Sequence, residues 1–126
     1  MMQMLTKAEH KVMEVFWENH NPLAIKDLPE KDSAINPNTA AVAVKNLLNK
    51  NFIKVSGITY HGTVLTREFE PIITREEYSL IKLQSDKLSI FDVISAFLKQ
   101  KPDEKELQKI EDLLNQYKRM YLSIPD

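Results

Sequence analysis

The stretch NPNTAAVAVKNLLNK, residues 36–50, decides the fold. It opens with asparagine followed by proline, a helix start signal, because an asparagine side chain can cap the first amides and proline suits the first helical turn. We therefore predict a helix over residues 38–50. Asn51 comes next, and asparagine is second only to glycine at the left-handed position that ends many helices. From Phe52 onward apolar and polar residues alternate, which predicts a strand after the helix.

The predicted helix 38–50 has two chemically different faces, as a spacing of about 100° per residue shows. The apolar face, expected in the core, consists of Ala40, Ala43, Val44, Leu47 and Leu48. The opposite face is formed by Asn38, Val42, Lys45 and Asn49, with Ala41 and Asn46 on its flanks. An ordinary solvent-exposed face is richer in glutamate and lysine. The outer face is therefore predicted to contact a partner.

Two predicted helices precede this one. Thr6 and Glu9 fit the capping-box pattern, which opens a predicted helix over residues 7–19. The apolar residues of this helix recur at helical spacing and are expected in the core. They are Ala8, Val12, Met13, Val15, Phe16 and Trp17. A short extended piece at residues 23–24 and a brief helix over 25–28, limited by the proline that follows it, complete the N-terminal part.

A β-hairpin is predicted after the third helix. Residues 52–55 and 63–69 have the alternation of antiparallel strands, with 56–62 as their connection. Three helices followed by a hairpin is the element order of a winged helix-turn-helix domain. We predict that residues 1–73 form such a domain and that it binds DNA.

Residues 74–126 are predicted to form three further helices. Capping patterns begin at Thr74 and Asp103, and Ser89 is a candidate N-cap between them. A segment shorter than about 70–80 residues rarely encloses a sufficient core alone, and oligomerisation is a common remedy. The expected fold class is thus mainly α with a small β-hairpin: a winged helix-turn-helix domain followed by a helical dimerisation domain.

We expect a two-fold homodimer, since closed dimers are the commonest assembly of soluble proteins. A dimer would also place two recognition helices at the spacing of two DNA half-sites, about 34 Å. The apolar residues expected at the interface are Leu88, Ile90, Phe91, Ile94, Phe97, Leu98, Leu107, Ile110, Leu114 and Tyr117. The alternative, in which these residues pack back on the N-terminal half, stays open.

The net charge of −1 conceals an uneven distribution of charge along the 126 residues. Residues 33–67 contain no acidic residue and four basic ones, Lys45, Lys50, Lys54 and Arg67. Phosphate binding depends on the charges at the contact surface and not on the total, because those charges release the counterions. The basic segment therefore favours a DNA partner, although a chance cluster on a solvated face has about equal weight on charge alone.

The base-facing candidates are the small and polar residues Asn38, Thr39, Val42 and Asn46. Asn49, on the same outer face, is also expected to contact DNA. Asparagine pairs with the edge of adenine, and a methyl of valine or threonine can meet the thymine methyl. This chemistry predicts an A·T-rich site. The first amides of the helix, around Asn36 and Asn38, are expected to seat a phosphate.

Lys45, Lys54 and Arg67 are expected to contact phosphates, which fixes the register without reading sequence. For Arg67, pairing with Glu68 or Glu70 has equal weight. His61 lies in the predicted wing tip and completes the DNA-facing set, with a solvated loop as its alternative.

Several function classes are excluded or disfavoured. The chain has no cysteine, which excludes disulfides, thiolate metal sites and thiol nucleophiles. Two glycines leave no glycine-rich phosphate loop, and His10 and His20 lack metal-ligand spacing. No apolar run approaches the about 20 residues of a membrane span, and the N-terminus lacks a secretory signal. We therefore expect a cytoplasmic protein that is not an enzyme and needs no cofactor or metal.

The sequence resembles the BlaI/MecI/CopY-type penicillinase-repressor family over nearly its whole length. The resemblance rests on LTKAEHKVMEVFW (5–17), on the start and end of the helix over 36–50, and on SIFDVISAF (89–97). The resemblance implies a dimeric repressor that binds a dyad-symmetric operator of double-stranded DNA and is released when an inducing signal arrives.

The resemblance carries over only in part. The family has a threonine where Val42 stands, an arginine where Asn46 stands and a glycine where Asn51 stands, so the operator sequence is left open. Antibiotic-responsive members are cleaved by a partner protease at an Asn-Phe bond, but the matching position here is Ala96-Phe97. Copper-responsive members use C-terminal cysteines, which are absent here. An unidentified sensor or protease thus remains open as the inducing partner.

A winged-helix module that binds protein instead of DNA is the alternative function. It is motivated by the exposed Ala41 and Val42 on the predicted outer face and by the missing helix arginine.

Overall fold

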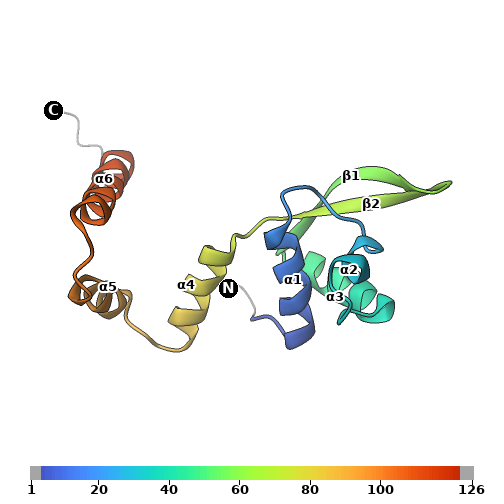
Figure 1. Cartoon of the computed structure of the whole chain (residues 1–126), viewed down its shortest axis with the longest axis horizontal. Coiled ribbons are helices and arrows are strands. Elements are labelled where there is room, and N and C mark those ends of the chain that lie inside the picture. Colours follow the sequence, from blue (N-terminus) through green and yellow to red (C-terminus); the bar gives the residue numbers. More distant parts are fainter. Residues whose placement is uncertain (1–3, 123–126) are drawn as a thin grey trace. The chain divides into compact units, whose positions relative to one another are not determined.

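The computed structural model describes residues 4–122 and divides the chain into two compact units (Figure 1). The first unit ends at Ser85 and the second begins at Asp86. The first contains α1 (Lys7–Glu18), α2 (Asp27–Lys31), α3 (Pro37–Asn49), β1 (Ile53–His61), β2 (Val64–Pro71) and α4 (Arg75–Ser85). The second contains α5 (Ile90–Lys99) and α6 (Glu104–Tyr121). Over the described residues the fold is mainly helical with a two-stranded antiparallel hairpin, as predicted.

The capping box predicted at the start of α1 is confirmed. The Glu9 amide donates to the Thr6 hydroxyl (3.2 Å), and the Thr6 amide donates to the Glu9 carboxylate (3.1 Å). The predicted core residues of this helix that are buried are Val12, Met13, Val15 and Phe16. Trp17 is half-buried, and its indole N–H donates to the carbonyl of Ile73 (2.8 Å). This bond ties the end of α1 to the segment that follows β2.

Helix α3 forms where the asparagine–proline signal predicts it. Asn36 is the N-cap, the next residue is the first of the helix, and Asn51 has the predicted left-handed conformation, with φ 63°. The buried residues of the inner face are Ala40, Ala43, Val44 and Leu47, and Leu48 is half-buried. Alanine at two of these positions lets the backbone of α3 lie close to its neighbours in the core. The predicted division of this helix into two faces is confirmed.

The second helix differs from its prediction over 25–28. Helix α2 spans Asp27–Lys31, and Pro29 is its third residue and not its limit. Proline is tolerated in the first helical turn, because the amide it lacks would have no partner there. The predicted extended piece is confirmed at Leu23, which exchanges backbone hydrogen bonds with Phe69 of β2 (3.0 and 2.8 Å).

The hairpin is longer than predicted, and the expected connection over 56–62 is wrong. Most of that segment continues β1, and the turn consists of Gly62 and Thr63 alone. Gly57 does not break the strand, because the ladder absorbs an extra residue as a bulge between Val55 and Gly57. Gly62 has a φ of 63° at the first central position, where type II′ hairpin turns favour glycine. The hairpin consequently extends past α2 and α3 (Figure 1).

Helix α4 packs with the first unit, although the sequence predicts it in the second domain. Its capping box between Thr74 and Glu77 is confirmed. Tyr78 is buried, its ring lies 5.7 Å from that of Phe52, and its hydroxyl accepts a hydrogen bond from the Leu5 amide (3.1 Å). The first compact unit therefore continues beyond the predicted boundary after residue 73.

The two faces of α3 should respond differently to truncation. Leu47→Ala removes a fully buried side chain and should lower the free energy of unfolding by about 2–5 kcal/mol. Val42→Ala is the matched control on the outer face, where the change should stay within about 0.5 kcal/mol. Urea denaturation followed by circular dichroism measures both values. Equal losses for the two variants would contradict the assignment of the faces.

Candidate nucleic-acid interface

The outer face of α3 is open to solvent, as the sequence predicts. Val42 is 60% exposed, and Asn38, Lys45 and Asn49 are exposed along the same side of the helix. The face carries a single charge, that of Lys45. An exposed apolar residue between amides and one cation matches the mixture of methyl contacts and hydrogen bonds that reads base edges.

The predicted phosphate seat at the start of α3 is smaller than expected. The Asn36 side chain caps the helix by accepting a hydrogen bond from the Thr39 amide (2.8 Å). Pro37 has no amide to offer. The amide of Asn38 is therefore the donor of the first turn that the capping interaction leaves for a phosphate.

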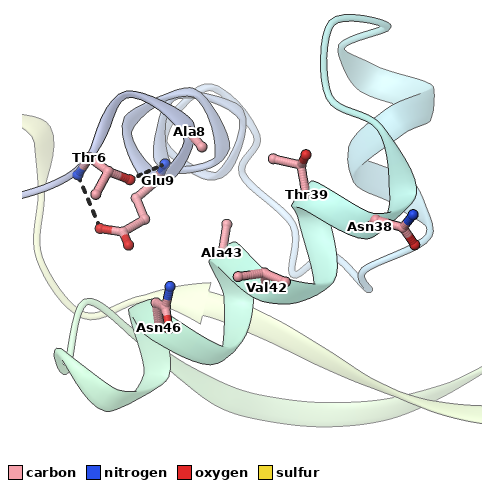
Figure 2. Close-up of a pocket in the computed structure, with 8 residues that line it drawn as sticks. All are labelled: Thr6, Ala8, Glu9, Asn38, Thr39, Val42, Ala43 and Asn46. Atoms are coloured by element: carbon pink, nitrogen blue, oxygen red, sulfur yellow. Dashed lines mark hydrogen bonds between the residues drawn. The ribbon is translucent and has the colours of Figure 1, made fainter.

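A groove of about 360 Å³ runs between the start of α1 and the outer side of α3. The residues that line it, drawn in Figure 2, are Thr6, Ala8, Glu9, Asn38, Thr39, Val42, Ala43 and Asn46. Asn46 is half-buried, and its amide nitrogen points toward the Glu9 carboxylate, whereas Asn38 points away from the groove (Figure 2). The sequence predicts both asparagines among the base-facing residues. The structure turns Asn46 partly toward the protein and leaves Asn38 free to reach outward.

A largely buried ion pair joins the two helices that flank this groove, α1 and α3. The Nζ of Lys50, at the C-cap of α3, lies 2.5 Å from the carboxylate of Glu9, which is 3% exposed. Burial raises the pKa of Glu9, but the hydrogen bond from Lys50, the Thr6 amide, the positive charge of Lys50 and the amide of Asn46 outweigh it. The pKa of Glu9 consequently lies below its ordinary value, and the carboxylate is charged at neutral pH.

Sequence reasoning missed this pair, because it counted Lys50 among the charges of the basic segment. Lys50 is only 16% exposed at its side chain and is neutralised by Glu9. The available signal was the position of Glu9, an acidic residue on the otherwise apolar side of α1. A buried carboxylate requires a cation nearby.

The other predicted phosphate contacts divide into paired and unpaired groups. Lys54 lies 3.4 Å from the Glu70 carboxylate across the hairpin, where both side chains are largely exposed. Arg67 is exposed and has no ion pair among residues 4–122, so the alternative of pairing with the neighbouring glutamates is not observed. Lys45 is likewise exposed and unpaired within these residues. The acid-free segment thus presents Lys45 and Arg67 as its uncommitted cations.

His61 does not project from the wing as the sequence predicts. It is the last residue of β1, and its Nε2 lies 3.3 Å from the Asp27 carboxylate at the start of α2. Its side chain is only 26% exposed. The imidazole therefore fastens the hairpin to α2.

The hairpin also exposes several large apolar side chains. They are Val55, Ile58, Tyr60, Val64 and Leu65. The signal that could have revealed them is the alternation along 56–62, which the predicted connection obscures.

The second unit contains no buried residue in either of its helices. The predicted interface residues all lie on or next to α5 and α6 and are between 36% and 78% exposed. The Asp103–Glu106 capping box of α6 is confirmed, whereas Ser89 occupies the N-cap position of α5 without a side-chain hydrogen bond.

Two further features concern the part of the chain that the structure describes. None of its helices is both long and apolar enough to cross a membrane. It also contains no group of three His, Cys, Asp or Glu residues that could hold a metal ion.

The family model described as "Penicillinase repressor" matches residues 5–116. The chain belongs to this family. Its members are transcriptional repressors that bind DNA and are not enzymes, so this penicillinase-repressor family protein is a DNA-binding regulator. A search among curated proteins found no match.

Solved structures of bacterial regulators are similar at low identity. A mutant MepR of Staphylococcus aureus bound to an oligodeoxyribonucleotide is 18% identical, with a TM-score of 0.46, over 90% of this chain and 77% of that one. Staphylococcus aureus MarR in complex with salicylate and kanamycin is 17% identical, with a TM-score of 0.43, over 95% and 75%. The adhesin competence repressor of Streptococcus pyogenes is 21% identical, with a TM-score of 0.41, over 92% and 80%.

The Glu9–Lys50 pair should matter most at neutral pH. Lys50→Met leaves a buried carboxylate without its cation and should cost about 3 kcal/mol, the lower end for a buried pair because Lys50 keeps some exposure. In the wild type, the pKa of Glu9 is lowered, so its stabilisation is present above the ordinary pKa and disappears as the pH falls through the folded value. In the variant, burial raises that pKa, so the deficit should shrink as acid protonates Glu9.

Denaturation of both proteins between pH 7 and pH 4 measures this effect. Lys54→Met is the control, because its exposed pair should contribute less than about 1 kcal/mol. A deficit for Lys50→Met that stays constant with pH would show that Lys50 acts by packing alone.

Proposed function

We propose that this protein is a homodimeric repressor that binds a dyad-symmetric operator, with α3 in the major groove, in the cytoplasm. The observation that carries the proposal is the division of α3 into a buried half and an exposed, nearly uncharged half. A helix fixed by its inner face, with small amides and a valine outside, can enter a groove without desolvating many charges.

The readout is proposed to come from few side chains. Asn38 points away from the protein and can hydrogen-bond to an adenine edge, and Val42 can pack on a thymine methyl. Thr39 lines the groove beside Val42, and Asn49 is exposed one turn from Lys45. Asn46 contributes less than an unengaged asparagine, because its amide nitrogen faces Glu9. These residues favour A·T pairs in each half-site.

Lys45 is the proposed phosphate contact on α3. It is exposed on the same face as Val42 and has no ion pair among the described residues. Lys54 is the weaker candidate, because contact with a phosphate would compete with Glu70. Phosphate contacts of this kind set the register of the helix on the duplex.

Dimerisation is proposed to occur through α5 and α6. A unit that buries none of its own helical residues has no core, so its apolar side chains need a partner to cover them. A second copy is the proposed partner, because a two-fold assembly also provides two copies of α3 for the two half-sites. The exposed apolar residues of these helices include Ile94, at 45%, and Leu114, at 55%.

Release from the operator is proposed to need a signal other than cleavage at an Asn-Phe bond or copper binding by cysteines, which the resemblance implies for other members of the family. The Ala96-Phe97 bond lies in α5 and replaces the Asn-Phe bond, and the chain has no cysteine for copper. The sensor or protease that supplies the signal is an open partner.

Binding to the operator should weaken steeply with salt. Genomic footprinting with the purified protein identifies the operator, and titrations at several salt concentrations give the slope. Lys45→Gln should lower the slope of log K against log [salt] by about 0.9 for each phosphate that the variant no longer neutralises, for all sequences alike. Val42→Ala should instead change the preferred bases and leave the slope unchanged.

Two results would contradict this function. Absence of footprints across the genome would exclude an operator. A stoichiometric protein partner whose binding is blocked by Val42→Glu would favour the alternative of a protein-binding module, since Val42 and Ala41 are exposed side by side.

Sedimentation equilibrium tests the dimer separately. Ile94→Glu and Leu114→Glu place a charge in the proposed interface and should shift the protein to a monomer with weaker operator binding. Ser95→Glu is the matched control, since Ser95 is an exposed polar residue of α5. A dimer that survives both interface substitutions would place the contact elsewhere.

A further inference from the structure

Arg75, in the first turn of α4, is held against α1 by three contacts. Its guanidinium lies 2.5 Å from the Glu14 carboxylate and 3.7 Å from that of Glu18. It also lies over the indole of Trp17, 5.7 Å from the ring centroid. Glu14 and Glu18 are one turn apart and therefore share a face of α1. A planar guanidinium suits two carboxylates and an aromatic ring together, and we call these contacts the Arg75 clamp.

The clamp matters because few other contacts hold α4. Tyr78 is its buried residue, and the rest of the helix is exposed or half-buried. The ring centroids of Tyr78 and Trp17 are 6.0 Å apart, so the indole contacts both this ring and Arg75. A helix with a single buried side chain is weakly fixed by packing, since burial is the main source of stabilisation. Arg75 therefore contributes a large share of the attachment of α4 to α1.

The clamp acts close to the boundary between the two compact units. The first unit ends with α4, at Ser85. The connection to α5 is short and exposed: a turn in which Lys87 has a φ of 62° leads to Ser89, the N-cap of α5. While α4 is attached to α1, the slack between the units is that of this turn. If α4 leaves α1, its own length of about 16 Å is added in each protomer.

We propose that Arg75 is a positioning residue for operator recognition: by keeping α4 on α1, it sets the separation of the half-sites that one dimer spans. The proposal rests on the proposed function, since only a dimer reads two half-sites. Arg75 acts through α4 in this role and makes no contact with DNA. A longer and looser tether lowers the effective concentration at the second half-site and widens the range of spacings that it can reach.

The geometry of B-DNA gives the scale of the effect. Two extra base pairs between the half-sites move one of them by about 7 Å along the axis and about 70° around it. The short turn after α4 offers little slack for such a change. A released α4 adds an arm of about 16 Å in each protomer, which exceeds the shift. Loss of the clamp should therefore flatten the dependence of affinity on spacing.

The alternative is that Arg75 binds a phosphate directly. Its side chain is 46% exposed, but Glu14 and Glu18 already neutralise its charge. The two roles predict opposite effects when these carboxylates are removed. A phosphate-binding Arg75 would be freed by their loss and would bind DNA more tightly at every spacing. A clamping Arg75 would lose its partners, and the spacing preference would weaken.

The test uses the full-length protein and footprinted operators whose half-sites are moved two base pairs closer together or farther apart. For the wild type, either change should raise Kd about tenfold. Arg75→Met should raise Kd for the native spacing about threefold and reduce the penalty for altered spacing to about threefold. Its affinity for a duplex with a single half-site should equal that of the wild type, because α3 is intact.

Two companion variants separate the clamp from a general effect of charge. Glu14→Gln combined with Glu18→Gln should reproduce the flattened spacing profile from the other side of the clamp. Lys82→Met is the matched control, since it removes the same charge from an exposed position of α4 that has no ion pair among residues 4–122. It should keep the wild-type profile. Circular dichroism establishes that each variant is folded.

Several results would overturn the proposal. Arg75→Met could keep the wild-type spacing profile, or it could weaken binding to the single half-site and to all spacings alike. The Glu14 and Glu18 double variant could bind more tightly with an unchanged profile, which would assign Arg75 to a phosphate. A wild type that is indifferent to spacing would also contradict the role of α4. Failure of the wild type to bind any operator would instead refute the proposed function.

Discussion

The ion pair between Glu9 and Lys50 is the interaction on which the arrangement of the first unit depends. The Glu9 carboxylate accepts the capping hydrogen bond from the Thr6 amide at the start of α1. It also forms the ion pair with Lys50 at the end of α3. The start of one helix and the end of another are therefore fixed to each other in the interior, where a misplaced charge is costly. The buried alanines of α3 also help to fix this helix, because their small side chains let its backbone lie close to the neighbouring elements of the core. A surface that reads base edges needs this rigidity, because hydrogen bonds to bases tolerate little displacement.

The same ion pair reduces the number of cations that the acid-free segment over residues 33–67 can offer to a phosphate. Four cations in the sequence suggest a broad basic surface, yet Lys50 is committed to the fold and Lys54 to Glu70. Lys45 and Arg67 remain, one on α3 and one on the hairpin. The proposed interface therefore combines these two cations with uncharged contacts. The amides and the valine on the outer face of α3 supply the uncharged contacts.

Local signals in the sequence predict much of the fold. Capping boxes at Thr6, Thr74 and Asp103 and the N-cap at Asn36 depend on residues three apart, so they can be recognised without tertiary structure. The division of α3 into faces follows from helical geometry. The length of β1 was missed, because Gly57 suggests a loop until its strand partner is known.

The ion pairs and side-chain orientations of the candidate site could not be predicted from the sequence. Lys50 and Glu9 are 41 residues apart, and only the packing of α3 on α1 brings them together. His61 was expected at a free tip, but its contact with Asp27 depends on how the hairpin lies against α2. The orientation of Asn46 depends on the same buried carboxylate. Contacts between distant segments thus decide which residues of a predicted face remain available to a ligand.

Substitution of single thymines by uracil in the operator tests the central claim most directly, because it removes a methyl group found only in the major groove. If the outer face of α3 reads that groove, uracil should weaken binding at positions in two half-sites separated by about 34 Å, and Val42→Ala should abolish the effect at the thymine that Val42 contacts. Binding that is indifferent to uracil at every position would contradict the account.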